Sequence, residues 1–213
     1  MPKIMSKRKI NIKQLANYFT ILFVLISLSA CQTLSSNQKA LTDKSYNRAK
    51  LDQQLLALDR FSVKGVIGII YNQKADSANF SYSQKGDDFD IRLYGPLGIG
   101  SVQIIGNDNK VTLIDNKGNE TQADNVQNLM MQQLGWFVPI DGLKYWIRGV
   151  SISDQDSNLE LNDNNLAKAI IETGWDIKYE NYSLIDVKYP LPNKMKMSRA
   201  DLTIKIVIKS WQL

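Results

Sequence analysis

Apolar and polar residues alternate over long stretches of this chain from Phe61 onward, and a period of two residues predicts β-strands. The first three strands, Phe61 to Tyr71, Ala78 to Tyr82 and Phe89 to Leu93, each place their large apolar residues on one face. Runs of Asn, Asp, Gly and Lys separate the strands, which predicts an antiparallel meander. Further strands are predicted over residues 101–106, 110–115, 167–173, 175–182, 194–199 and 202–211.

Three other stretches have helical spacing. Leu51, Leu55 and Leu58 fall on one face of an amphipathic helix predicted over residues 46–58. A second helix is predicted after Asp124, a suitable N-cap, and it ends at Gly135. A short third helix is predicted over residues 141–148.

About ten strands with two to three helices predict a mainly β (α+β) protein built on a curled antiparallel sheet, because a sheet of this size tends to curl or close. Two interpretations of its interior remain open. In one, the large apolar side chains form an ordinary core packed by the helices. In the other, the sheet is a barrel whose inner wall encloses an apolar ligand cavity.

The N-terminus has the pattern of a secretory leader. Five basic residues between Lys3 and Lys13 precede an apolar segment, Ile21 to Leu28, which is too short to cross a bilayer as a helix. The sequence Leu-Ser-Ala-Cys then ends at Cys31 and resembles the lipobox of bacterial lipoproteins. We therefore expect a signal peptide over residues 1–30, cleavage before Cys31 and acylation of that residue. Residues 31–45 are polar and predict a flexible tether, followed by one domain over residues 46–213.

Cleavage changes the charge of the protein. Five of the 26 basic residues lie in the leader and no acidic residue does, so the mature chain has 21 basic and 21 acidic residues. Its formal net charge is zero. A domain without excess positive charge argues against nucleic acid as a partner.

Missing residue types exclude much chemistry. The chain has no histidine and its single cysteine is expected to carry lipid, so a Ser-His-Asp triad, a histidine or thiolate metal site and a cysteine nucleophile are excluded. We expect no catalytic residues, no metal and no cofactor. The remaining enzymatic alternative uses the carboxylates of Asp87, Asp88 and Asp90 as acid and base, although acids in a turn are usually solvated.

A series of motifs, in order along nearly the whole mature chain, resembles the LolB family. The motifs are GPLG (residues 95–98), VTLIDNKG (111–118), LGWFVPIDGLKYWIRG (134–149), GWDIKYENY (174–182), LPNKM (191–195) and KIVIKSW (205–211). Each is weak alone, but their order and spacing are specific. The chain departs from the family in its first strand, where Lys64 stands at a position that is commonly arginine.

This resemblance implies a half-open antiparallel β-barrel with helices plugging one side and an apolar cavity for acyl chains. It implies a receptor that takes acylated lipoproteins from a periplasmic, LolA-like carrier and inserts them into the inner leaflet of the outer membrane. Gln32, where an aspartate would often mark inner-membrane retention, favours a lipid anchor at the periplasmic face of the outer membrane. We expect a monomer.

Two groups of residues are expected to carry this function. Pro96, Leu97 and Gly98 form a loop whose apolar tip either dips into the bilayer during delivery or folds back to close the barrel. The acyl-chain cavity is expected to be lined in part by large side chains on alternating positions: Phe80, Tyr82, Phe89, Ile91, Leu93, Trp146, Trp175, Tyr179, Met195 and Met197. The alternative function is a structural outer-membrane lipoprotein that serves as a docking module without lipid cargo.

Overall fold

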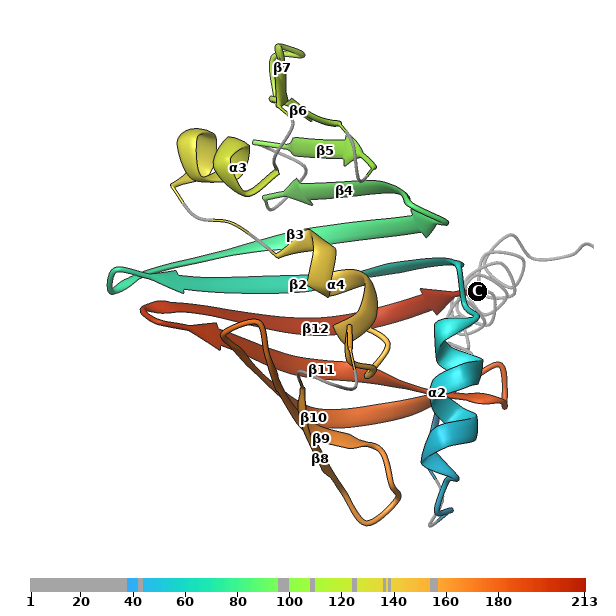
Figure 1. The fold of residues 1–213 in the computed structure, drawn as a ribbon. Coiled ribbons are helices and arrows are strands. Elements are labelled where there is room, and N and C mark those ends of the chain that lie inside the picture. The colour runs from blue at the N-terminus through green and yellow to red at the C-terminus, as the bar shows by residue number, and fades with distance from the viewer. Residues whose placement is uncertain are drawn as a thin grey trace, which may run out of the picture. The chain divides into compact units, whose positions relative to one another are not determined.

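The computed structural model describes residues 38–41, 44–95, 100–107, 110–123, 126–135, 137, 139–153 and 157–213. These residues form one antiparallel sheet and three helices (Figure 1). The helices are α2 (Arg48–Leu56), α3 (Val126–Leu134) and α4 (Ile140–Trp146). The strands are β1 (Gln38–Ala40), β2 (Arg60–Tyr71), β3 (Lys74–Lys85), β4 (Asp88–Tyr94), β5 (Val102–Gly106), β6 (Val111–Ile114), β7 (Glu120–Ala123), β8 (Asn158–Leu161), β9 (Ala167–Glu172), β10 (Trp175–Ile185), β11 (Tyr189–Arg199) and β12 (Leu202–Gln212).

The sheet is open. Its strand order is β7-β6-β5-β4-β3-β2-β12-β11-β10-β9-β8, so the two ends of the chain of pairings, β7 and β8, do not pair with each other. The short strand β1 pairs with the last residues of β10, on the edge where β9 pairs with its first residues. The predicted mainly β, antiparallel and half-open architecture is confirmed.

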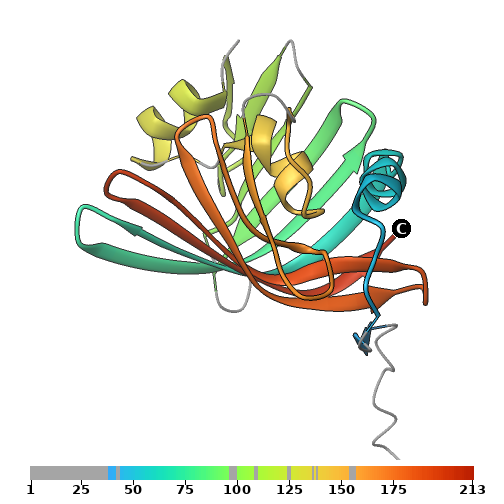
Figure 2. The same cartoon turned by 60° about the horizontal axis from the view of Figure 1, so that its bottom comes forward.

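The sheet curls into a trough, and the helices lie over its open side (Figure 2). In this view α3 and α4 cross the mouth of the trough, while α2 lies along one side. The side chains that the sheet buries therefore lie between the strands and these helices. The interior of the trough is the region for which the sequence left two interpretations open, a packed core and a ligand cavity.

The longest hairpin shows how the sequence determines the sheet. Along β2 the buried residues alternate with half-buried or exposed ones, as the period of two predicts. A two-residue turn of Asn72 and Gln73 joins β2 to β3, and both residues have positive φ (49° and 63°). Such a turn matches the twist of paired strands, so β3 starts at Lys74, earlier than the alternation alone predicts.

Local capping fixes the helix ends. The Asn47 side chain accepts a hydrogen bond from the Lys50 amide (3.0 Å) and caps α2, which buries Leu51 and Leu55 as predicted. Helix α3 ends at Gly135, whose φ of +75° suits a glycine that follows a helix. The predicted cap of this helix, Asp124, lies outside the described residues.

Three strands were not predicted. They are β7, β8 and β1, and β1 lies within the segment expected to be a tether. Its residues Gln38 and Ala40 pair with Ile185 and Ser183. Among the described residues, no helix is both long enough and apolar enough to span a membrane.

Candidate functional site

Rows of buried apolar side chains run across the inner face of the sheet. Register pairs Val63 with Tyr82, Tyr82 with Ile91, and Ile91 with Ile104, and all four residues are buried. A second row passes from Ile177 through Met197 and Ile204 to Ile69. Because the rows cross from β10 to β5, the interior is one continuous apolar cluster.

The structure brings the predicted cavity residues together. Nine of the ten are buried in this cluster, and the tenth, Phe89, is half-buried and packs against it. Most come from the inner faces of β3, β4, β10 and β11, while Trp146 comes from the end of α4. The sequence predicted that these residues lie together, and they do. That they line a cavity for acyl chains stays a prediction.

Aromatic rings connect this cluster to α4. Trp146 lies 6.1 Å from Trp175 between ring centroids, and Phe137 meets Trp175 edge to face at 6.0 Å. Phe137 also lines a pocket of about 340 Å³ together with Tyr71, Met131 and Leu202. This pocket, which we call the entrance pocket, lies between α3 and the turn that joins β11 to β12. The ring contacts continue from it to the predicted cavity residues.

Buried polar groups hold α4 against the sheet. The Trp146 indole N–H donates to the carboxylate of Glu172 in β9, which also accepts the backbone N–H of Ile152 at 3.0 Å. The hydroxyl of Tyr179 donates to the Trp146 carbonyl (2.8 Å). Glu172 is buried, and these donors satisfy its carboxylate oxygens. These bonds fix the end of α4 to two strands, β9 through Glu172 and β10 through Tyr179.

Arg148 ties α4 to α2. Its guanidinium is buried and donates to the carbonyls of Leu55 (2.7 Å), Leu56 (3.3 Å) and Leu58 (2.9 Å), which end α2, and to that of Lys144 (2.7 Å). Burial lowers the pKa of this guanidinium from its ordinary value, but an arginine stays charged in proteins. The cation thus satisfies carbonyls at the negative end of a helix.

Three tyrosines of the interior stay neutral: Tyr82 and Tyr179 are buried, and Tyr182 is half-buried. Burial raises the pKa of the Tyr82, Tyr179 and Tyr182 hydroxyls above the ordinary value. Each remains a hydrogen-bond donor at neutral pH: Tyr182 donates to the Ala167 carbonyl at 2.7 Å, and Tyr82 to the Gln84 side chain. The interior therefore gains fixed polar contacts without gaining charge.

The carboxylates of the enzymatic alternative do not form an acid and base pair at a cavity: Asp88 lines a pocket of about 370 Å³, but no second carboxylate lines it among the described residues. Asp87 is exposed and lies 3.7 Å from the Lys144 ammonium. Asp90 forms an ion pair with Arg92 (3.1 Å) and accepts hydrogen bonds from Gln103 (3.1 Å). Their neighbours are those of solvated surface acids.

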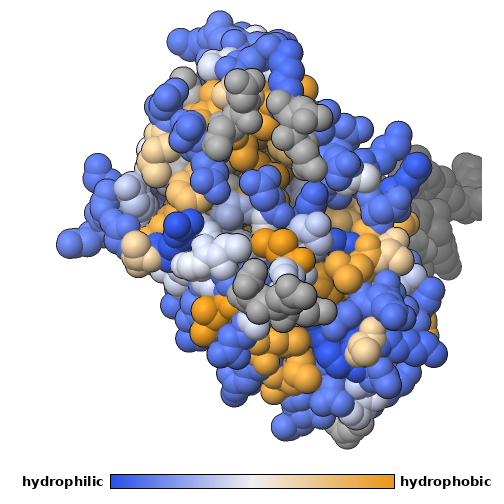
Figure 3. Space-filling model, viewed as in Figure 1, coloured by the Kyte–Doolittle hydropathy of each residue, from blue (hydrophilic) through white to orange (hydrophobic). Residues whose placement is uncertain are grey.

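Hydrophobic surface appears on the face that carries the helices (Figure 3). It is divided into separate patches by hydrophilic residues, both around α4 and over the end of the sheet that contains β9 and β10. Residues Cys31, Pro96, Leu97 and Gly98, to which the sequence assigns the anchor and the membrane loop, lie outside the described residues.

The chain belongs to the class of half-open β-barrel proteins. Its open antiparallel sheet curls around an apolar interior, and short helices lie across the mouth. A solved LolA superfamily protein of Nitrosomonas europaea shares this fold, with a TM-score of 0.52 and 12% identity over 78% of this chain and 91% of that chain. The likeness at this identity concerns the fold alone.

The family is given by sequence. The family model described as outer membrane lipoprotein LolB matches residues 59–211. An outer-membrane lipoprotein LolB of Francisella tularensis subsp. novicida is 49% identical over 98% of this chain and 100% of its own length, and one of Pseudomonas syringae is 33% identical over 90% and 94%. The chain belongs to the LolB family of outer-membrane lipoproteins.

Family membership decides two of the open questions. It supports a role in lipoprotein localisation at the outer membrane. It also sets aside the enzymatic alternative, because this is a family of transport lipoproteins and not of enzymes.

Proposed function

We propose that this protein is a lipid-anchored receptor that accepts acylated lipoproteins from a periplasmic, LolA-like carrier and inserts them into the outer membrane. The observation that carries the proposal is the continuous apolar interior of the open sheet, which only short helices cover. Cys31 holds the anchor, at the periplasmic face. Cofactors and nucleotides have no part in the transfer.

The binding of an acyl chain requires no covalent chemistry. Removal of each methylene from water contributes about 0.8 kcal/mol, so a chain gains a large free energy on entering an apolar interior. The entrance pocket is the proposed point of entry, because Phe137, which lines it, contacts Trp175, and Trp175 in turn contacts Trp146. Met195 and Met197, buried in the same apolar cluster, supply side chains that adapt to a flexible ligand.

Protein stripped of lipid is expected to bind a fluorescent acyl probe saturably, and Met131→Glu is expected to weaken this binding. The substitution places a charge next to the apolar side chains of the entrance pocket, Tyr71, Phe137 and Leu202, and its cost in desolvation predicts a loss of about tenfold in affinity. Fluorescence titration measures the affinity.

Val207→Glu is the matched control. Met131 and Val207 are apolar and similarly exposed, at 39% and 41%, but Val207 lies in β12 with its side chain outside the buried cluster. The control is expected to bind the probe like the parent protein. If the parent protein shows no saturable binding, the transfer function is wrong and the docking module becomes the better interpretation.

Leu97→Glu is expected to separate receiving from releasing cargo. If Leu97 is a membrane probe, the new charge opposes insertion by a few kcal/mol at most, and by about 1 kcal/mol or less at headgroup depth, while acceptance from the carrier stays normal. Transfer of a labelled lipoprotein from carrier to protein, and then to liposomes, measures both steps.

The melting temperature of the same variant tests the alternative role of Leu97. A plug that closes the barrel would bring the charge against apolar surface and lower stability markedly. Normal delivery by a stably folded Leu97→Glu protein would contradict the probe role.

A further inference from the structure

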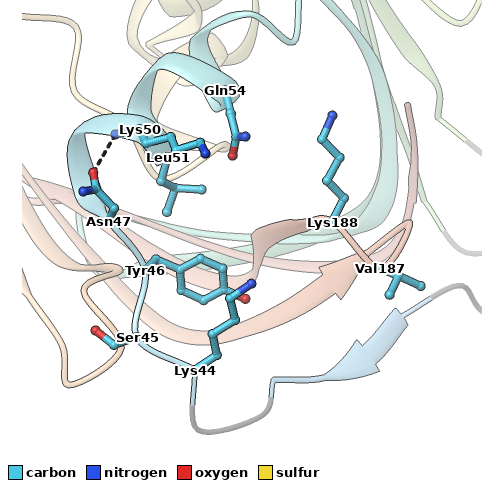
Figure 4. A pocket seen from close by; sticks show the side chains of 9 residues that line it. All are labelled: Lys44, Ser45, Tyr46, Asn47, Lys50, Leu51, Gln54, Val187 and Lys188. Carbon is cyan, nitrogen blue, oxygen red and sulfur yellow. Dashed lines mark hydrogen bonds between the residues drawn. The ribbon is translucent and has the colours of Figure 1, made fainter.

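A pocket of about 350 Å³ lies at the opposite end of β11 from the entrance pocket. It is formed by the start of α2, the residues just before it and the turn between β10 and β11 (Figure 4). Lys44, Lys50 and Lys188 line it, and no carboxylate does among the described residues. We call it the lysine pocket.

The three ammonium groups of the lysine pocket lack acidic partners within the described part of the chain. The Lys44 ammonium lies 5.3 Å from the ring centroid of Tyr46. The Lys188 ammonium lies 4.5 Å from the Tyr189 centroid and donates to the Tyr189 hydroxyl (2.8 Å). Other surface lysines, such as Lys168 and Lys194, do form ion pairs with glutamates. Positive charge thus gathers around a cavity that no carboxylate lines among the described residues, which suits an anionic ligand.

An exposed apolar side chain stands at the edge of this pocket. Val187 is 79% exposed, the highest value among the large exposed hydrophobic residues, and it occupies the turn with a φ of +57°. A β-branched residue rarely adopts this conformation, and Asn or Gly would fit there without strain. Figure 4 shows Val187 pointing away from the pocket interior. An apolar tip beside a cationic pocket is the combination that favours a membrane interface.

The position of β1 places this end of the domain close to the membrane. Because Gln38 pairs with Ile185, the chain that comes from the N-terminus joins the domain beside the turn that carries Val187. Six residues lie between Cys31 and Gln38, and the seven Cα-to-Cα steps that join the two reach at most about 25 Å when fully extended. This step rests on the proposed function, in which Cys31 carries the lipid anchor.

We propose that the lysine pocket binds the phosphate of an anionic phospholipid in the leaflet that holds the anchor, while Val187 enters the headgroup region. The contact docks the domain on the bilayer in one orientation. In the docked orientation the entrance pocket faces away from the bilayer, because β11, 11 residues long, separates the two ends. The strand that precedes the loop of Leu97, β4, also runs away from the end that carries the lysine pocket, so delivery through that loop follows release of this contact. A carrier that approaches from the periplasm meets the entrance pocket directly.

The test uses the mature, lipidated protein in vesicles of phosphatidylcholine with or without phosphatidylglycerol. Lipid occupies Cys31, so Val187→Cys introduces a single free thiol for an environment-sensitive fluorophore. We expect a blue shift and protection from an aqueous quencher with phosphatidylglycerol, and their loss in high salt or with phosphatidylcholine alone.

Substitution of the three lysines gives the quantitative result. A lysine near an anionic surface contributes about fivefold to binding, so Lys44→Gln, Lys50→Gln and Lys188→Gln together are expected to lower the ratio of docked to undocked protein on the order of a hundredfold. The matched control is Lys178→Gln, Lys196→Gln and Lys205→Gln, three lysines that lie opposite one another across β10, β11 and β12. This control removes the same charge and is expected to dock normally.

Docking that is equal in both kinds of vesicle, or that survives in the pocket variant, would overturn the proposal. Binding of inorganic phosphate to the detergent-solubilised protein, without a change in vesicles, would overturn it too and would assign the pocket to a free anion. The delivery of a labelled lipoprotein is measured in the same vesicles. Delivery without docking rejects the lysine pocket alone, whereas docking without delivery supports the pocket and rejects the proposed function.

Discussion

Arg148→Ala is expected to lower the free energy of unfolding by about 3–5 kcal/mol, since hydrogen bonds from a charged donor contribute about 1.5–3 kcal/mol each and several are lost together. The substitution removes the guanidinium donor from the carbonyls of Leu55 and Leu58, of which that of Leu55 keeps the Leu58 N–H (3.2 Å), at a helix end that is packed on the apolar cluster. It also removes the guanidinium that lies 5.7 Å from the ring centroid of Phe61. Urea unfolding followed by tryptophan fluorescence measures the loss.

Two further variants serve as controls for Arg148→Ala. Arg92→Ala removes an exposed arginine that pairs with Asp90, and a loss below about 1 kcal/mol is expected. Arg148→Lys keeps the charge but lacks the planar fork that reaches several carbonyls, so an intermediate loss is expected. Equal stability of Arg148→Ala and Arg92→Ala would show that water replaces the guanidinium at no cost.

Gly65→Ala is expected to destabilise the protein by about 3 kcal/mol, the upper range for added volume in a packed interior. A Cβ atom at this position would lie 2.1 Å from the carbonyl oxygen of Val207 and 2.8 Å from the Phe80 ring. The nearer atom belongs to the backbone of β12, next to an irregularity of register between Ile208 and Ser210. The strand itself must therefore move, and thermal or urea unfolding detects the cost.

Gly68→Ala, in the same strand, is the matched control. Its Cβ atom would meet nothing closer than 4.0 Å. A glycine inside a strand weakens it, so the change is expected to be neutral or to stabilise by up to about 1 kcal/mol. Similar losses for Gly65→Ala and Gly68→Ala would mean that close contact with β12 is not what requires glycine at position 65.

Strands with one buried face could be predicted from the sequence because alternation records burial directly. This holds for β2, whose inward residues from Phe61 to Ile69 were all identified. Polar strands leave no such signal: β7 has the sequence ETQA. The start of β11 was missed because Pro190 and Pro192 argue against a strand. They are tolerated there because residues 189–192 pair with β10 but not with β12.

The apolar part of the site was predictable for the same reason, but its polar supports were not. Glu172 and Arg148 resemble ordinary charged residues in the sequence, and their partners lie in other elements. Only the packed structure shows that they are buried. The motif that contains Arg148 marked it as part of a family pattern and gave no indication of its bonds to the end of α2.

The open sheet has a consequence for neighbouring copies of the protein. Its outer strands, β7 and β8, each leave one edge of backbone donors and acceptors unpaired within the described sheet, and such an edge is a template for a further strand. Anchored proteins are concentrated in two dimensions, where long apolar edges would join them into ribbons. Both strands are only four residues long, and each carries a glutamate, Glu120 or Glu160. Short, charged borders let the trough stay open on a crowded surface without lateral polymerisation.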